Sequence, residues 1–177
     1  MLEIKELKAP PSLELFSELV ELLQDAVSGG APIGWTQVPS TKEARNYWTE
    51  VLEAVGRGER LLFVATDNHV CAGAIQVARA PRQNARHRGE LQKLMVHSQY
   101  RRRGIGRALV EATEKAAAAR GLTLLVLDVR PGNDAERLCK RCGYQCVGTI
   151  PGFVQAAGGG YDPTVIYYRR IGAAPQS

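Results

Sequence analysis

A turn rich in arginine and glycine is the most chemically suggestive stretch of the sequence. It reads Arg101-Arg102-Arg103-Gly104-Ile105-Gly106-Arg107 and stands between a short apolar run and a segment with helical spacing. The first N–H groups of a helix have no partner inside the helix, and the helix dipole adds partial positive charge there. Glycine lets an anion approach the backbone, and arginine neutralises phosphate. We therefore predict that these seven residues bind a polyphosphate.

Two familiar phosphate-binding motifs do not fit this turn. A dinucleotide fingerprint needs a third glycine where Leu109 stands, and a P-loop needs a Gly-Lys-Ser/Thr sequence that occurs nowhere in the chain. The alternative without function is a basic turn from a strand to a helix that binds no ligand.

Two carboxylates flank the apolar runs on either side of this turn. Glu90 precedes the run from Leu91 to Val96, and Asp128 lies near the end of the run from Leu122 to Val129. Ligands of α/β sheets sit beyond the carboxyl ends of such strands, and a carboxylate there can accept a proton from an amine. We expect a partly dry cleft around Glu90. The alternatives are a solvated strand start for Glu90 and a turn cap for Asp128.

The four cysteines do not form a metal or disulfide pattern. Cys139 and Cys142 are three residues apart, but no second such pair and no matching pair of histidines exists, so we predict no metal site. Packing is the favoured role for these thiols. No secretory signal and no long apolar segment is present, and a reducing, cytoplasmic setting with no membrane partner follows as the expectation.

Charge is distributed unevenly along the 177 residues. Residues 1–60 hold six basic and ten acidic side chains, whereas residues 61–177 hold seventeen and eight. No aromatic residues interleave the basic ones, so a phosphate-bearing cofactor is favoured over nucleic acid. The length predicts one domain, residues 1–171, followed by a short tail, residues 172–177.

The predicted elements alternate in a way that is typical of a mixed sheet. We expect strands at 2–7, 60–66, 70–78, 90–96, 122–129, 144–150 and 164–169, and helices at 12–28, 40–56, 104–120 and 133–142. The fold class is therefore α+β, with a mostly antiparallel sheet of about seven strands, a central βαβ unit and about four helices.

The motifs resemble those of the GCN5-related N-acetyltransferases (GNAT). The resemblance is carried by Arg101-x-x-Gly104-x-Gly106, by Asn133-Asp134-Ala135 and by Gly143-Tyr144. It implies that the turn holds the pyrophosphate of acetyl-CoA, that the pantetheine follows Leu94, Met95 and Val96, and that Asn133 belongs to the cofactor site.

A narrower resemblance is to the tabtoxin-resistance type of acetyltransferase. It rests on stretches that share one register: Gly29-Gly30-Ala31, Gly34, Glu90-x-Gln92-Lys93-Leu94-Met95-Val96, Leu127-Asp128, Pro151-Gly152 and Pro163-Thr164-x-Ile166-Tyr167. It implies that Glu90 and Asp128 are the catalytic acidic residues and also contact the substrate. Ile33 and Trp35, in a glycine-rich loop, are candidate substrate contacts, with packing as the alternative.

One position departs from the family pattern. A tyrosine commonly protonates the departing sulfur in this family, but here the matching pair is Leu138-Cys139. Cys139 is the candidate acid, and water or Tyr144 are the alternatives.

These features predict a cytoplasmic, acetyl-CoA-dependent N-acetyltransferase. The acceptor is expected to be a primary amine of a small molecule, such as an amino-acid-like toxin or antibiotic, which attacks directly in a ternary complex. The alternatives are acetylation of a protein N-terminus or lysine, and a non-catalytic acyl-CoA-binding module. The sequence leaves the oligomeric state open, a homodimer included.

Overall fold

A single seven-stranded sheet organises the chain in the computed structural model, which describes residues 1–8 and 10–172. The strand order is β1-β2-β3-β4-β5-β7-β6, and β4 and β5 form the parallel pair among otherwise antiparallel neighbours. The elements are β1 (Leu2–Glu6), α1 (Leu13–Ser28), α2 (Thr41–Gly56), β2 (Arg60–Asp67), β3 (Val70–Arg79), the 3-10 turn η1 (Gln83–Ala85), β4 (Arg88–Val96), the 3-10 turn η2 (Ser98–Tyr100), α3 (Ile105–Ala119), β5 (Leu124–Val129), α4 (Asp134–Arg141), β6 (Gln145–Gln155) and β7 (Tyr161–Arg170). The predicted α+β class with a central βαβ unit is confirmed. Of the predicted tail, residues 173–177 lie outside the described part.

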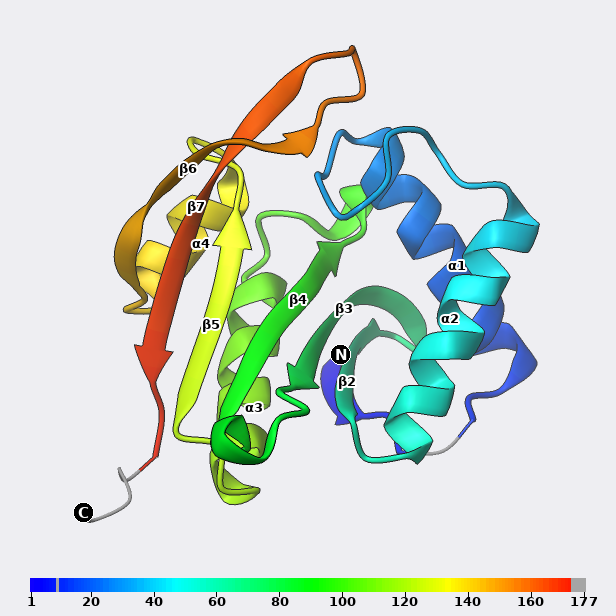
Figure 1. Ribbon diagram of the computed structural model, residues 1–177. Helices are drawn as coiled ribbons and strands as arrows, with labels where there is room; N and C mark the ends of the chain where they lie inside the picture. Colours follow the sequence, from blue (N-terminus) through cyan, green and yellow to red (C-terminus); the bar gives the residue numbers. More distant parts are fainter. Residues whose placement is uncertain (9, 173–177) are drawn as a thin grey trace.

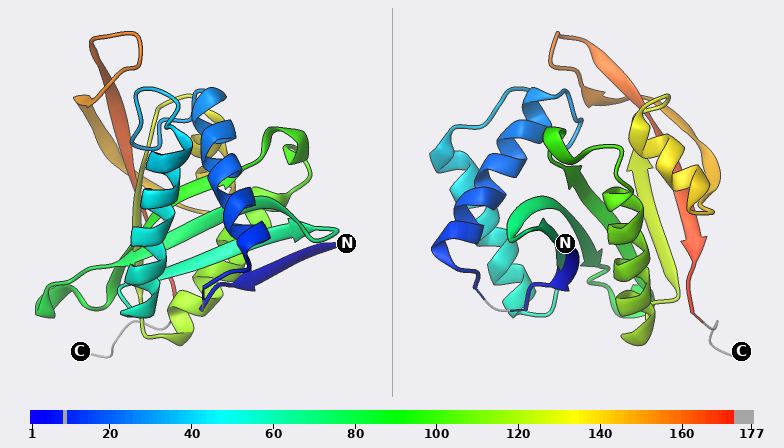
Figure 2. Two further views of the ribbon diagram at one scale, coloured as in Figure 1. Left: turned by 90° about the vertical axis from the view of Figure 1, so that its right-hand side faces the viewer. Right: turned by 180° about the vertical axis from the view of Figure 1, so that it is seen from behind.

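Helices cover the two faces of the sheet unequally. Helices α1 and α2 lie over one face, on the side of β2, β3 and β4, whereas α3 and α4 lie against the other (Figures 1 and 2). Each face has its own apolar core. In the α1–α2 core the indole of Trp48 is fully buried and donates a hydrogen bond to the carbonyl of Leu19 at 2.7 Å.

The starts of α1 and α2 follow from local capping chemistry. The Ser12 hydroxyl accepts the N–H of Leu15, and Ser40 and Glu43 form a complete capping box. Both devices satisfy N–H groups that a helix leaves free at its start.

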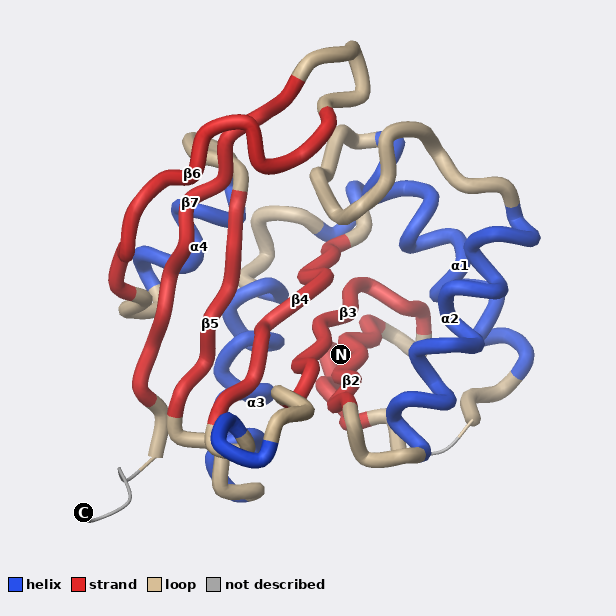
Figure 3. Tube along the Cα trace, in the orientation of Figure 1, coloured by secondary structure: helices blue, strands red, loops and turns tan. Residues whose placement is uncertain are grey.

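Strand β5 differs from its prediction. Its nearly continuous apolar run suggests a strand covered on both faces, but only Leu125 and Leu127 are buried, and Asp128 is exposed. The reason is visible in Figure 3, where α1 and α2 stay on the side of β2–β4 and leave one face of β5 open. Strands β6 and β7 also extend beyond their predicted ends, to Gln155 and from Tyr161, and form a projecting hairpin (Figure 1).

The sheet opens between its two central strands. Strands β4 and β5 pair only from Arg88 to Glu90 and from Leu124 to Val126, and beyond these residues they part. The backbone edges that face each other past this point have no strand partner, and α3 crosses behind the gap.

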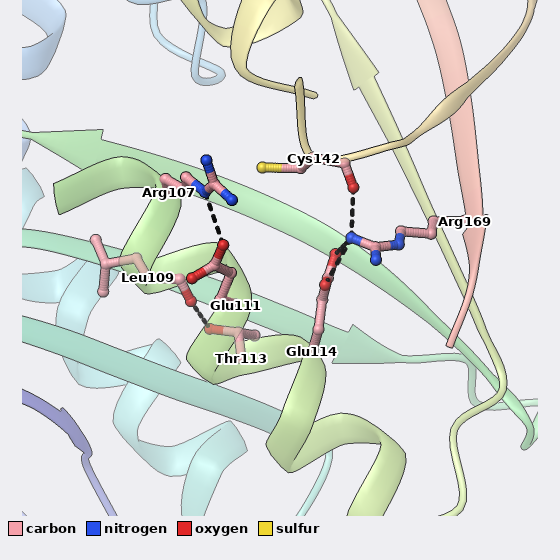
Figure 4. Close-up of polar contacts among 7 residues, drawn as sticks. All are labelled: Arg107, Leu109, Glu111, Thr113, Glu114, Cys142 and Arg169. Atoms are coloured by element: carbon pink, nitrogen blue, oxygen red, sulfur yellow. Dashed lines mark hydrogen bonds and ion pairs between the residues drawn. The ribbon is translucent and has the colours of Figure 1, made fainter. Parts of the chain in front are cut away.

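A partly buried ion pair links α3 to β7 (Figure 4). Arg169 of β7 donates to both carboxylate oxygens of Glu114, at 3.1 and 2.9 Å, and also to the carbonyl of Cys142. Glu114 is only 9% exposed, and this burial raises its pKa, an effect that Arg169 opposes. The pair holds α3, α4 and β7 together behind the opening.

Candidate active site

A cleft of about 760 Å³ occupies the opening between β4 and β5. One part is lined by the turn before α3 and by α4, and the other by the loop between α1 and α2, by β4 and by the β6–β7 hairpin. We call these the cradle part, which includes Arg101, Arg102, Gly104, Ile105, Gly106, Arg107, Asn133 and Leu138, and the acceptor part, which includes Ile33, Gly34, Glu90, Gln92, Lys93, Asp128, Val154 and Thr164.

The cradle part has the backbone geometry that an anion requires. Gly104 caps α3 with φ at 80°, and no protein atom lies within 4 Å of the position of a Cβ there. The N–H groups of Ile105, Gly106 and Arg107 are the first of the helix and therefore have no partner within it. Gly106 also packs closely, since a Cβ would lie 3.1 Å from Leu138 Cδ2. The turn thus offers free amides at a positive helix end.

The four arginines of the turn point in different directions. Arg101, Arg102 and Arg107 line the cleft, and Arg107 also pairs with Glu111 at 2.7 Å (Figure 4). Arg103 does not line it. Its guanidinium lies over the ring of Tyr100 and 3.7 Å from Asp67, and the role of Arg103 in binding phosphate stays a prediction.

The turn is held from outside by a residue that the sequence does not mark as functional. Asp25, near the end of α1, accepts hydrogen bonds from the Ser98 N–H at 2.8 Å and the Ser98 hydroxyl at 2.6 Å. This ties the α1 core to the segment that leads into the cradle.

A β-bulge in β4 shapes the acceptor part. Lys93 has φ at 53°, and the register with β3 shifts by one residue there. Before the bulge, Leu91 packs into the core beneath α3; after it, Met95 packs into the core beneath α1 and α2. The bulge therefore reverses which side chains face the cleft and brings Gln92 and Lys93, neighbours in sequence, into its lining.

Lys93 is a site residue that the sequence does not predict. Its ammonium donates to the carbonyl of Ile33 at 2.5 Å, and a Cβ on Gly34 would come within 2.9 Å of it. Burial lowers the pKa of Lys93, while the charges of Asp128 and Glu90 oppose the shift. The available signal was a lysine in the middle of a central strand, next to Gln92.

The two predicted carboxylates share one face of the sheet. Glu90 pairs in register with Val126, and Asp128 lies two residues further along β5. Thr164 of β7 donates to Asp128 at 3.1 Å. Both carboxylates line the cleft, but both are exposed, so the expectation of a partly dry cleft around Glu90 is wrong. The cause is the uncovered face of β5.

The two side chains considered as acids for the leaving sulfur, Cys139 and Tyr144, are poorly placed to donate a proton. Cys139 lines the cleft but is only 6% exposed, and burial raises the pKa of its thiol to about 12. Tyr144 does not line the cleft. Its hydroxyl is buried on the α3 side without a hydrogen-bond partner among the described residues, and its pKa is raised by burial, so the Tyr144 alternative is corrected.

The two predicted substrate contacts in the glycine-rich loop, Ile33 and Trp35, lie in different surroundings. Ile33 lines the cleft, whereas Trp35 does not: it packs edge-on against Tyr47 with ring centroids 6.4 Å apart. The packing alternative therefore describes Trp35.

Asn133 lines the cradle part and caps α4, accepting the N–H of Glu136 at 2.8 Å.

Neither a metal centre nor a membrane span emerges from residues 1–8 and 10–172. No group of three possible ligands of the His, Cys, Asp or Glu type gathers there, and no helix in this part is long and apolar enough to cross a bilayer.

Comparisons with known proteins agree with this geometry. The model of the "Acetyltransferase (GNAT) family" matches residues 17–144. A protein of Azospirillum brasilense, named an uncharacterized N-acetyltransferase in the hisH–hisA intergenic region, is 35% identical over 115 residues, which cover 64% of this chain and 67% of that protein.

Solved structures show the same fold at low sequence identity. The ribosomal-protein-alanine N-acetyltransferase of Brucella melitensis superposes with a TM-score of 0.80 at 23% identity, covering 96% of this chain and 99% of its own. The ribosomal α-N-protein acetyltransferase RimL, solved in complex with coenzyme A, gives 0.80 at 19% identity, with 96% and 94% covered.

Proposed function

The chain belongs to the GNAT family of acetyltransferases, and on that basis we propose that it transfers the acetyl group of acetyl-CoA to a primary amine of a small, amino-acid-like molecule. The observation that carries the proposal is one continuous cleft, with an anion cradle at one end and two exposed carboxylates at the other. Acetyl-CoA supplies a thioester, which an uncharged amine can attack directly.

The cradle residues have separable tasks in this proposal. The amides from Ile105 to Arg107 hold the pyrophosphate, and Arg101 and Arg102 add positive charge beside it. The edge of β4 at Leu94, Met95 and Val96, which has no strand partner on the side of the opening, offers backbone groups to the pantetheine amides. Gly104 keeps the approach to the helix end open.

The acceptor part supplies proton transfer and orientation. An alkylamine is mostly protonated near neutral pH, so a group must accept its proton before attack. We assign this role to Glu90, directly or through one water, and assign to Asp128 the binding of the ammonium group. The departing thiolate needs no acid from the chain, because the proton that Glu90 takes from the amine can reach it through water and an ordinary thiol has a pKa of about 8.5. Cys139 is buried with a raised pKa, and Tyr144 lies outside the cleft.

The tabtoxin-resistance resemblance supports a toxin or antibiotic as the acceptor, and cytoplasmic action suits the four free thiols. Protein N-termini are the second candidate acceptor, favoured by the ribosomal-protein acetyltransferases among the similar structures.

A panel of amines incubated with acetyl-CoA, with release of the CoA thiol as the readout, tests the proposal. We expect turnover with amino-acid-like amines and little with peptides that mimic ribosomal-protein N-termini. Turnover confined to the peptides would replace the acceptor class. Tight acetyl-CoA binding without turnover of any amine or peptide would favour a non-catalytic binding module.

A further inference from the structure

A chain of hydrogen bonds beside the acceptor part has its donors and acceptors fixed by chemistry. Arg60 Nη1 donates to Gln76 Oε1 at 2.6 Å and to Gln92 Oε1 at 2.9 Å, and Gln76 Nε2 donates to the Tyr47 hydroxyl at 2.9 Å. A guanidinium can only donate, so both glutamines must turn their oxygens toward it. Gln76 is completely buried, which makes the arrangement rigid.

The orientation of Gln92 has a consequence for the cleft. Because its oxygen is committed to Arg60, its NH₂ group must point elsewhere, and Gln92 lines the cleft. No described residue accepts a hydrogen bond from this NH₂ group. Arg60 has no carboxylate within 4 Å among the described residues, so its charge stands uncompensated behind the amide.

Lys93 adds a second donor at the same place. The bulge turns it into the cleft next to Gln92, and the carbonyl of Ile33 is the one acceptor its ammonium has among residues 1–8 and 10–172. The acceptor part therefore presents donors and positive charge from Gln92 and Lys93, with Arg60 bonded to Gln92 outside the lining, and the carboxylates Glu90 and Asp128 line the same part. This set of charges is complementary to a zwitterion.

We propose that Gln92 and Lys93 form a carboxylate-binding subsite, in which Arg60 orients Gln92, and that the acceptor is a primary amine carrying a carboxylate. The inference rests on the proposed function and specifies its substrate class. Gln92 and Lys93 contact the acceptor in this arrangement, and Arg60 is a positioning residue.

Matched pairs of α-amino acids and their primary amides, assayed with saturating acetyl-CoA, test the subsite. We expect kcat/KM for the acids to exceed that for the amides by about tenfold or more, the effect of a hydrogen bond to a charged group. Gln92→Glu keeps the shape and the bond to Arg60 but turns a negative charge outward, so it should abolish or reverse the preference. Arg60→Met and Lys93→Met should reduce it. Arg57→Met removes an exposed arginine outside the cleft and should leave it unchanged.

A binding measurement separates this inference from the proposed function. Calorimetry with N-acetylated amino acids and N-acetylated amino amides, added to the CoA-saturated protein, reports the subsite without turnover. If amines are acetylated but acids and amides are used equally, and Gln92→Glu changes nothing, the subsite is overturned and the function stands. If nothing is acetylated but the acid binds more tightly and Gln92→Glu removes the difference, the function falls and the subsite stands.

Discussion

At the scale of single residues, Glu90 carries the sharpest prediction. Glu90→Gln keeps the shape of the side chain but removes its basicity, so kcat should fall by roughly a hundredfold or more while acetyl-CoA binding is preserved. Steady-state kinetics and calorimetry measure the two effects. Glu50→Gln, on the exposed surface of α2, is the control and should change neither.

Asp128 provides the contrast to Glu90. If Asp128 holds the ammonium group, Asp128→Asn should raise KM for the amine more than it lowers kcat. Full turnover of Glu90→Gln together with an inactive Asp128→Asn would exchange the two assignments. Activity of both variants would leave water as the proton acceptor.

Cys139 should prove dispensable for chemistry. A thiol with a pKa of about 12 cannot readily protonate a CoA thiolate, whose conjugate acid has a pKa of about 8.5 as an ordinary thiol. Cys139→Ala should therefore keep kcat and its pH profile and cost only about 1 kcal/mol of stability through lost packing. A loss of kcat with unchanged acetyl-CoA affinity would restore Cys139 as the acid.

At the scale of elements, matched substitutions at the two ends of α3 distinguish an effect on stability from an effect on acetyl-CoA binding. Gly104 and Gly121 both have φ at 80°, and neither has a protein atom within 4 Å of its Cβ position. Alanine at either should cost about 1–2 kcal/mol through backbone strain. Only Gly104→Ala should also weaken acetyl-CoA binding, by about tenfold, because Gly104 lines the cleft. Equal affinities of the two folded variants in calorimetry would refute the cradle.

The loop between β5 and α4 depends on one ionised carboxylate. Glu136 accepts hydrogen bonds from the Gly132 N–H at 2.6 Å and the Tyr167 hydroxyl at 2.7 Å, and pairs with Lys140 at 2.9 Å. These contacts lower its pKa to about 2 from the 4.5 of a free glutamate. The native state therefore binds fewer protons than the unfolded one, and the stabilisation is present above pH 4.5 and lost as the pH falls toward 2.

Urea unfolding at several pH values measures this effect. The free energy of unfolding of the parent should exceed that of Glu136→Gln near neutral pH, and the difference should shrink below pH 4.5. A difference that stays constant with pH would mean that the charge of Glu136 contributes nothing.

The elements also show what the sequence can and cannot predict. Helix caps such as Ser12 and Ser40 act locally, and the order of strands follows from apolar runs separated by turns, so both were predictable. The bulge at Lys93 was not, because it depends on register with β3 and reverses the alternation that sequence reading assumes. The joint placement of Gln92 and Lys93 in the cleft follows from this bulge. The open face of β5 follows from where α1 and α2 pack. Neither feature could be predicted from the sequence.

At the scale of the whole molecule, the uneven charge along the chain favours a polyphosphate ligand at the opening in the sheet. The basic excess in residues 61–177 includes the arginines of the cradle, and a polyphosphate ligand should associate more slowly as salt rises. Nucleic acid, the alternative ligand for this charge, would also bind less tightly as salt rises, but acetyl-CoA would not displace it.

Coenzyme binding should join the two halves of the sheet. Strands β4 and β5 share only three register pairs, and other links between β1–β4 and β5–β7 are the Glu114–Arg169 ion pair and the apolar core that α3 shares with β5. A ligand at one hundred times its Kd stabilises the folded state by about 2.7 kcal/mol. For a chain of this size, CoA at that excess should raise Tm by roughly 5–10 °C.

Hydrogen exchange distinguishes this joining from simple phosphate binding. CoA should protect backbone amides at residues 94–96 of β4 and 127–129 of β5, because its pantetheine lies along the opening. Adenosine 3′,5′-bisphosphate lacks the pantetheine, so it should raise Tm less and leave these strand edges unprotected. If CoA raises Tm but the exchange of both edges is unchanged, the ligand binds outside the opening and the two halves of the sheet are not coupled through it.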